Sequence, residues 1–482
     1  MPKLILSLSM KNKTKGKVQS EKSSTGAKND SELKSASQPL KKTLFGVEVE
    51  LLLIDKNGKV VHKADDIIAK VKKSEQQNLA ITKECAHNMI ELGGLPNVNV
   101  PTTIDATLDL LKQTLLVTEQ ENLMLCPLGT YPGAFSPEMR LTEQQYKAKK
   151  IIFGKTKFSI GGRVFGFHAH FALPWGVFDA NKKIIKKLVH SKYKETLVRA
   201  YNLLIAMDPA LTTFMQSSPF YQGEFLGKNA RVIVYRGGNT FNYPNGMYAD
   251  YQEFGALQPY ENTGGDLIHS ITKRYEQWRA YLKKLEVNFK TYTKHRSILD
   301  TAWNPVKVNA NGTLEQRGMD MNHPQILIST ALVIKYILKM VLEEFIDVVP
   351  DDAAEANPFK YKDGKILIPP HSYVRGTLQP LAAVKGLDSP QVLHYAKSLI
   401  ALAESFMPEN RKAFLAPLKE MIEKKKTVSD EIIDDVKKKG HTDFSKPLPQ
   451  NIAQEIALEH ANRLFKETLL TQQQIANLSA DN

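Results

Sequence analysis

The segment that most constrains the fold of this chain is the strand-like run TLFGVEVELLLID, residues 43–55. Successive side chains of a strand point to opposite faces, so Glu48 and Glu50 share one face and the apolar residues between them share the other. Two carboxylates about 7 Å apart repel each other unless a cation or solvent separates them. The run therefore predicts either a cation site or an edge strand whose acidic face is solvated.

Two further segments show strand alternation with chemically active side chains. In GGRVFGFHAHFALPW, alternation places His168 and His170 on one face, where two imidazoles can converge on a metal or a phosphate. In TLEQRGMDMNHP it places Glu315 beside Arg317. Such a pair is either a structural ion pair or a way to hold a cation and steer an anionic phosphate.

A fourth segment, ECAHNMIELGG, carries Glu84 and Glu91 around an apolar stretch. We expect its end to be a strand that closes on Gly93 and Gly94, and in a helix the seven-residue spacing would still leave both carboxylates near one face. Oxygen ligands with an imidazole and no thiolate favour Mg²⁺ or Mn²⁺ over a structural zinc site. An arginine among them indicates phosphoryl chemistry.

The motifs GVEVE, ECAHNMIEL, GTYPG, GFHAHFALP, MQSSPF and LEQRGMDMNHP occur in this order. They resemble those of the glutamate-cysteine ligase group, which includes the type 2 carboxylate-amine ligases, from about residue 43 to residue 347. The resemblance implies an α+β, glutamine-synthetase-like fold, in which a curved, mainly antiparallel sheet forms a funnel backed by helices. It also implies transfer of the γ-phosphoryl group of ATP to a carboxylate, after which an amine displaces phosphate from the acyl phosphate.

The resemblance further implies a role for each matching residue. Two or three Mg²⁺ ions, or Mn²⁺, would be held by Glu48, Glu50, Glu84, Glu91, His168 and Glu315. Arg317 would contact the transferring phosphate, with Glu315 and Glu50 completing the catalytic set. We expect Arg231 to contact ATP or a substrate carboxylate, and His170 to contact substrate or nucleotide rather than metal. Because the chain has no P-loop and no Gly-x-Gly-x-x-Gly fingerprint, metals and arginines are expected to hold ATP.

The net charge of +14 suggests nucleic-acid or membrane binding at first sight, but its distribution argues otherwise. Residues 1–42 carry ten lysines against three acidic residues, which is +7 and half of the excess. A segment this polar and rich in lysine cannot bury enough apolar surface to fold. We therefore expect a disordered leader that could tether an acidic partner. We expect no specific nucleic-acid partner.

Cysteine content and hydropathy indicate the compartment. The two cysteines, Cys85 and Cys126, are expected to be small buried hydrophobes, and so few in 482 residues fit a reducing, cytoplasmic location. We find no uncharged apolar run of the roughly 20 residues that a membrane span needs. A soluble enzyme of small-molecule substrates is expected.

The predicted domains are a catalytic domain over residues 43–350 and a helical region over residues 351–482 that packs on it. The apolar run 324–349 predicts a helix buried behind the sheet. Amphipathic helices are expected at about 389–406, 409–425, 429–439 and 451–470. Two further segments carry candidate contact residues.

The first, residues 228–241, alternates like a strand and carries Arg231 and, as a weaker candidate contact, Arg236. The second, residues 358–380, is rich in Pro and Gly and is either a surface loop or a cover for the site mouth. In the latter case it would present His371, Tyr373 and Arg375.

Three functions remain open at this point. The favoured one is a glutamate-cysteine ligase that forms γ-glutamylcysteine, or a ligase of the same fold with another amine or acid. The second is a metal-dependent hydrolase built on the His-x-His strand, which leaves Glu48, Glu50 and the Glu315–Arg317 pair unexplained. The third is a noncatalytic binding or scaffolding protein.

Overall fold

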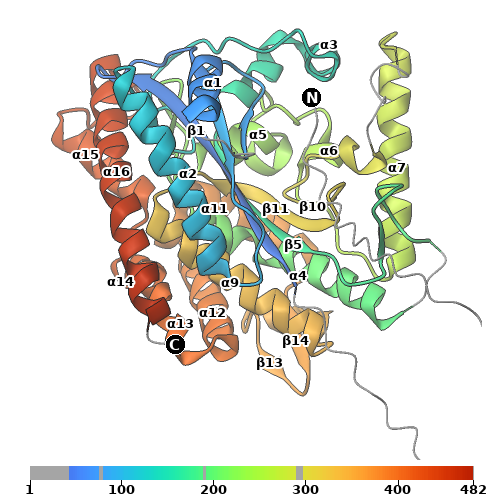
Figure 1. Ribbon diagram of the computed structural model, residues 1–482. Helices are drawn as coiled ribbons and strands as arrows, with labels where there is room; N and C mark the ends of the chain where they lie inside the picture. The colour runs from blue at the N-terminus through green and yellow to red at the C-terminus, as the bar shows by residue number, and fades with distance from the viewer. Residues whose placement is uncertain (1–42, 75–79, 188–190, 289–296, 481–482) are drawn as a thin grey trace, which may run out of the picture. The chain divides into compact units, whose positions relative to one another are not determined.

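The carboxylate-bearing segments meet in one antiparallel sheet. The computed structural model describes residues 43–74, 80–187, 191–288 and 297–480, and the sheet has seven strands in the order β10-β11-β5-β1-β3-β2, with β4 also paired to β1 (Figure 1). Its strands are β1 Phe45–Asp55, β2 Ile81–Lys83, β3 Met89–Gly93, β4 Leu123–Cys126, β5 Gly166–Ala172, β10 Val306–Asn309 and β11 Thr313–Asp320. The mixed α+β class and the mainly antiparallel sheet are as the sequence predicted.

Smaller strand pairs lie outside this sheet. These strands are β6 Phe178–Asp179, β7 Ile184–Ile185, β8 Phe220–Tyr221, β9 Glu224–Phe225, β12 Asp347–Pro350, β13 Tyr361–Lys362 and β14 Lys365–Ile368. The last three form their own small sheet, so the segment 358–380 is not a plain surface loop. Gly364 takes a positive φ of 72°, which suits the tight turn between β13 and β14.

Helices make up most of the remaining structure. In the first half of the chain they are α1 Ala64–Ser74, α2 Val100–Gln120, α3 Gln144–Ser159, α4 Lys192–Phe214, α5 Ala230–Arg236, α6 Gln252–Gly255 and α7 Gly264–Lys284. In the second half they are α9 Pro324–Glu343, α10 His371–Tyr373, α11 Gln379–Lys385, α12 Pro390–Phe406, α13 Glu409–Lys412, α14 Ala416–Lys424, α15 Val428–Lys438 and α16 Gln450–Ala480. A π-helical turn, Val374–Leu378, joins α10 to α11.

Apolar helices cover one side of the sheet. The buried side chains of α2, α4 and α9 pack against β1, β11 and β5, respectively, and form one core with them. α9 begins at Pro324, where the missing N–H costs nothing. It ends at residue 343 rather than at the predicted 349, because Phe345 takes a positive φ of 54° and residues 347–350 form β12. By length and composition α9 could cross a bilayer. Most of it is buried inside the protein, however, and buried core helices often have the same length and apolar composition.

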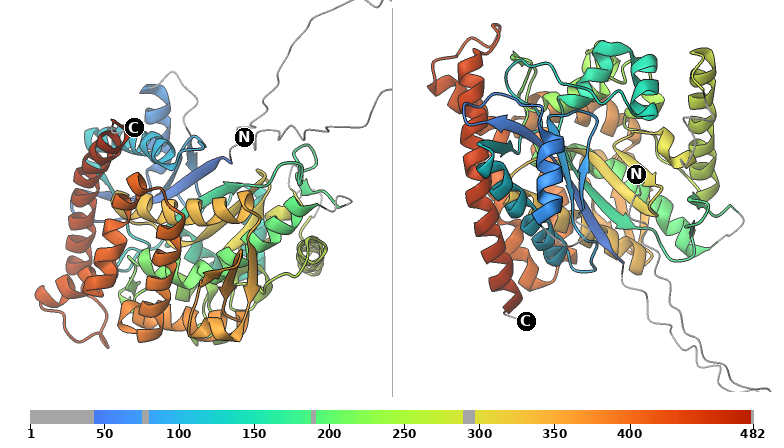
Figure 2. Two further views of the ribbon diagram at one scale, coloured as in Figure 1. Left: turned by 90° about the horizontal axis from the view of Figure 1, so that it is seen from below. Right: turned by 45° about the horizontal axis from the view of Figure 1, so that its top comes forward.

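The helical C-terminal part packs on these helices. α12 contacts α4 and α9, and the long α16 lies beside α2 in each view (Figures 1 and 2). α12 and α15 lie close to where periodicity predicted them. α16 begins as predicted but continues ten residues past the expected end at 470, and the predicted helix over 409–425 is divided into α13 and α14. The domain boundary at residue 350 stays a prediction, and the basic leader lies outside the described residues.

The strand predicted over residues 228–241 is wrong, because residues 230–236 form the helix α5. Asn229 caps this helix by accepting a hydrogen bond from the Val232 N–H, and Gly237 ends it with a φ of 56°. Nearly every residue between these two is buried. An apolar segment buried on all sides carries no usable period, so the caps decide its structure.

Candidate active site

The register of four neighbouring strands brings the predicted residues onto one face of the sheet. The facing pairs are Glu50 with Glu91 across β1 and β3, Glu48 with His168 across β1 and β5, and His170 with Glu315 across β5 and β11. Directly opposed residues of an antiparallel ladder lie on the same face with Cβ atoms about 5 Å apart. Strand pairing alone therefore gathers acidic and imidazole side chains from segments more than 250 residues apart.

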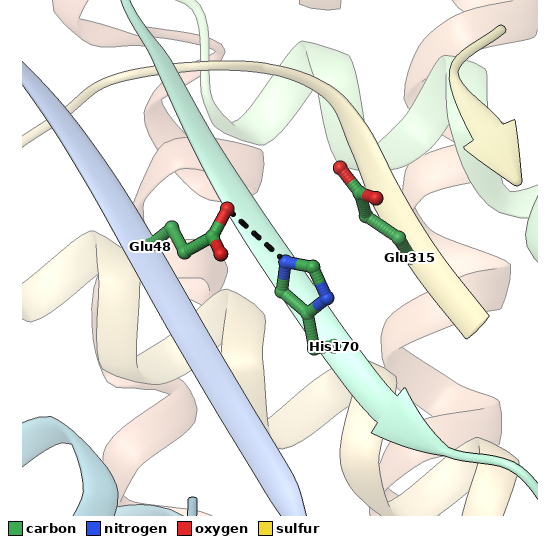
Figure 3. Close-up of side chains that lie close together, drawn as sticks. All are labelled: Glu48, His170 and Glu315. Atoms are coloured by element: carbon green, nitrogen blue, oxygen red, sulfur yellow. Dashed lines mark ion pairs between the residues drawn. The ribbon is translucent and has the colours of Figure 1, made fainter. Parts of the chain in front are cut away.

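The first group on this face comprises Glu48, His170 and Glu315 (Figure 3). One potential ligand atom from each lies within 4.8 Å of the others. His170 Nε2 lies 3.3 Å from Glu48 Oε2 without the alignment of a hydrogen bond, and His170 Nδ1 lies 3.0 Å from Thr313 Oγ1. Two carboxylates and an imidazole nitrogen that converge in this way match the donor set of a divalent cation.

His168 lies between this group and its neighbour. Its Nδ1 atom is 3.3 Å from Glu48 Oε2, and its Nε2 atom is 3.8 Å from Glu50 Oε1. The side chain is buried, and its Nε2 atom has no hydrogen-bond partner among the described residues. The structure thus brings both histidines to the carboxylates, and it groups His170 more closely with Glu315.

The charges of the first group stabilise one another. Burial works to raise the pKa of Glu48, but His170 and His168 outweigh it and hold that pKa well below its usual range. Burial also opposes ionisation of Glu315, yet Lys307, Arg317 and the imidazoles bring its pKa down to about 2. Burial favours neutral His170, but Glu48 and Glu315 raise its pKa to about 9. The carboxylates are therefore ionised, and in the metal-free protein the protonated His170 and the neighbouring basic side chains compensate their charge.

The second group comprises Glu50, Glu84 and Glu91, whose oxygens also lie within 4.8 Å of one another. Burial, followed by the charges of Glu91 and Glu50, raises the pKa of Glu84 well above its usual value, and burial with Glu48 raises that of Glu91. Glu50 accepts a 2.6 Å hydrogen bond from the Gly166 N–H. Three carboxylates so close together and with so little compensation favour the binding of a cation.

Glu84 itself lies just before the predicted strand. The strand that the sequence places at the end of this segment is β3, Met89–Gly93, and Glu84 belongs to the connection between β2 and β3. Asn88 in this connection donates a 3.0 Å hydrogen bond to the Gly162 carbonyl. Burial raises the pKa of the adjacent Cys85 thiol and that of Cys126, the latter to about 12, so both behave as unreactive thiols.

Arginines border the two groups. Arg317 Nε lies 3.6 Å from Glu315 Oε1, and although burial opposes its charge, Glu315 raises the pKa of Arg317. Arg231 of α5 is 5% exposed, and its Nη2 donates a 3.4 Å hydrogen bond to the Arg317 carbonyl. Its Nε has no partner among the described residues. Arg236 instead directs its guanidinium to Asp208, in two hydrogen bonds of 2.6 and 2.9 Å.

Two residues beside the site, Lys307 and Asn309, were not predicted from the sequence. Asn309 of β10 donates a 2.5 Å hydrogen bond to Glu315 Oε2, and Lys307 Nζ lies 4.0 Å from the same oxygen. The signal for both was the Asn311–Gly312 pair, which marks the turn of a β10–β11 hairpin and so sets Lys307 opposite Glu315. His371 and Arg375, in contrast, contact residues outside the two groups: His371 Nε2 lies 3.3 Å from the Leu257 carbonyl oxygen, and Arg375 Nη2 donates a 3.0 Å hydrogen bond to Gln252 Oε1.

Comparison with known families settles the class of this chain. The profile of glutamate-cysteine ligase family 2 matches residues 44–435. The chain belongs to this family. It is accordingly an ATP-dependent carboxylate-amine ligase, as the sequence motifs predicted.

Solved structures agree on the fold. A glutamate-cysteine ligase from Francisella tularensis, in complex with AMP, is 13% identical with a TM-score of 0.52, and the match covers 92% of this chain and 95% of that one. A bifunctional glutathione synthetase from Pasteurella multocida is also 13% identical with a TM-score of 0.52, over 88% of this chain. This chain spans about half of that protein, 53%. A search of curated protein sequences gives no significant match.

Proposed function

We propose that this family member joins the γ-carboxyl group of glutamate to the amino group of cysteine through an acyl phosphate. The observation that carries the proposal is the pair of acidic groups around Glu48 and Glu50, set beside Arg317 on one sheet face of a carboxylate-amine ligase. ATP supplies the phosphoryl group. The family and the fold support this reaction, while glutamate and cysteine are our choice of substrates.

The donor atoms of both groups fit Mg²⁺ or Mn²⁺. Glu48, His170 and Glu315 would hold one ion, and Glu50, Glu84 and Glu91 would hold another. The ions would screen the repulsion between ATP and the substrate carboxylate. We propose His170 as a ligand because of its place beside Glu315, and His168 as the residue that joins the two groups, with a nitrogen near each.

Arginines would handle the anionic reactants. Arg317 would donate to the oxygens of the transferring phosphoryl group, because Glu315 keeps its guanidinium at the edge of the first group. Arg231 is buried, lies with its guanidinium 5.8 Å from the ring centre of Tyr235, and has a free Nε among the described atoms. It could therefore take a second phosphate or a substrate carboxylate.

The reaction needs no protein nucleophile. A carboxylate oxygen of the acid attacks the γ-phosphorus of ATP and ADP leaves, and the amine nitrogen then attacks the acyl carbon and phosphate leaves with that oxygen. The amine loses its extra proton in the second step. The site chiefly orients the two anions and stabilises the charge that develops, which can supply most of the barrier reduction. The hydrolase and scaffold hypotheses gain no support from this geometry.

Isotope transfer tests the proposal directly. Purified protein is incubated with Mg²⁺, ATP, cysteine and glutamate labelled with ¹⁸O in its γ-carboxyl group, and ADP, phosphate and product are measured. We expect ADP release that requires both amino acids, a product with the mass of γ-glutamylcysteine, and one ¹⁸O atom in the phosphate. Unlabelled phosphate would exclude the acyl phosphate, and turnover only with other acids or amines would reassign the substrates.

A further inference from the structure

A buried ion pair lies behind the strand that carries Glu315 and Arg317. It joins Asp208 of α4, which is fully buried, to Arg236 of α5, which is 2% exposed. Taking both charges out of water is unfavourable, and a hydrophobic pair of similar volume often stabilises a protein as well or better. Stability alone is therefore a poor explanation for this pair.

The pair lies against an irregular part of β11. The register of β11 on β5 shifts by one residue between Gln316 and Met319. Arg317 and Gly318 together thus stand opposite the single residue His168. A bulge of this kind bends a strand and changes the direction of the side chain that it carries. Here that side chain belongs to Arg317.

Asp208 and Arg236 hold the bulge at Gly318. A Cβ atom at Gly318 would lie 2.4 Å from Arg236 Nη2 and 2.7 Å from Asp208 Oδ1, so the backbone approaches the pair as only glycine allows. Gln316 completes the link, since its Nε2 donates to Asp208 Oδ1 at 3.2 Å and its Oε1 accepts from the Gly318 N–H at 3.2 Å. The backbone that follows Arg317 is therefore tied to Asp208.

The same pair controls charge beside the site. Arg236, Arg231 and Arg317 line one small cavity, so three basic residues lie close together here. Asp208 offsets one of these charges, and Gln379 of α11 holds its second oxygen with a 3.2 Å hydrogen bond. Without Asp208, Arg236 would be a buried cation without its partner and would repel the other two arginines.

We propose that Asp208 is a positioning residue, which acts through Arg236, Gln316 and the β11 bulge to aim Arg317 at the site. The inference rests on the proposed function, in which Arg317 contacts the transferring phosphoryl group. A displacement of about 1 Å in such a group can reduce the rate of the chemical step about 100-fold. The effect should appear in kcat rather than in the KM for ATP.

A double-mutant cycle tests the proposal. We expect Asp208→Asn to lower kcat about 10- to 100-fold with little change in KM, and to have almost no further effect in an Arg317→Lys background. Gln316→Met keeps the ion pair but removes both hydrogen bonds of Gln316, the one to Asp208 and the one from the Gly318 N–H, so a smaller loss with the same non-additivity is expected. Losses that multiply fully in the double variants, or a change confined to KM, would overturn the proposal.

A matched control and a second readout distinguish failure of the proposed function from failure of the positioning role of Asp208. Asp347→Asn breaks the 2.6 Å ion pair with Arg199, which lies on the same helix α4 away from the bulge, and should leave kcat unchanged. Hydrogen exchange of the peptide Thr313–Asp320 should accelerate in Asp208→Asn and not in this control. Absence of ATP turnover in the wild type would refute the proposed function, whereas unchanged exchange in this peptide would refute the positioning role.

Discussion

Replacing Glu84 by glutamine should stabilise the metal-free protein while it removes activity. Oxygens of Glu84, Glu50 and Glu91 lie within 4.8 Å of one another, and burial with these neighbours raises the pKa of Glu84 well above its usual value. Two ionised carboxylates at this distance repel each other by about 3 kcal/mol at an effective dielectric constant of about 20. Because partial protonation already relieves some of this repulsion, we expect the free energy of unfolding to rise by about 1–3 kcal/mol.

The pH dependence of this gain has a defined sign. A carboxyl group whose pKa is raised by folding binds more protons in the native state than in the unfolded state, so wild-type stability falls as the pH rises through that raised pKa. The amide that replaces this carboxyl group in the variant has no such proton to lose. The stability advantage of Glu84→Gln over the wild type should therefore be larger at pH 8 than at pH 5.

Thermal melting in the presence of a chelator measures the gain. An unfolding entropy of about 2.1 cal/mol/K per residue gives about 1 kcal/mol/K for a chain of 482 residues, so Tm should rise by about 1–3 °C. Added Mg²⁺ should raise the Tm of the wild type and much less that of the variant, whose turnover should fall at least about 100-fold. Glu276→Gln, at an exposed position of α7, should change neither.

Two results would contradict the repulsion and the ligand role assigned to Glu84. One is a Glu84→Gln protein that is less stable than the wild type at pH 8 without metal, because the carboxylates would then not repel each other in the native state. The other is normal ATP turnover by the variant, because a ligand of a required ion cannot lose its charge without effect.

Three further predictions concern histidines and a cysteine. His170→Asn should lower turnover at saturating Mg²⁺ more than His168→Asn, which should chiefly raise the Mg²⁺ concentration needed for half-maximal rate; equal profiles in Mg²⁺ titrations would contradict the proposed division. Burial lowers the pKa of His460 to about 4 and holds that of its partner His323 well below its usual value, so urea-unfolding stability should fall as the pH falls from about 6.5 to 4, and His460→Phe should flatten this slope. Cys126→Ala should keep full kcat in the ADP-release assay, because burial raises the pKa of this thiol and leaves it unreactive. A loss of kcat larger than the loss of stability explains would show that the thiol has a role in the reaction.

Much of the candidate site could be predicted because strand alternation is a local property. The alternation of β1 fixes that Glu48 and Glu50 share a face, and that of β5 does the same for His168 and His170. The prediction failed for α5, where a mostly buried segment carries no usable period and the two caps, Asn229 and Gly237, decide the structure. Strand alternation also did not predict the role of Asn309, because its hydrogen bond to Glu315 depends on the hairpin turn between β10 and β11.

The sequence by itself determined which residue types face the site, and it determined the ligase family through the order of its motifs. Only the tertiary structure decided which of these residues meet. Alternation has a period of two and is the same for every register, so it cannot say that Glu315 stands opposite His170, or that a bulge follows Gln316. These features belong to the pairing of β5 with β11, and Gln316 beside the bulge donates a hydrogen bond to Asp208, a buried residue on a helix more than 100 positions earlier in the chain.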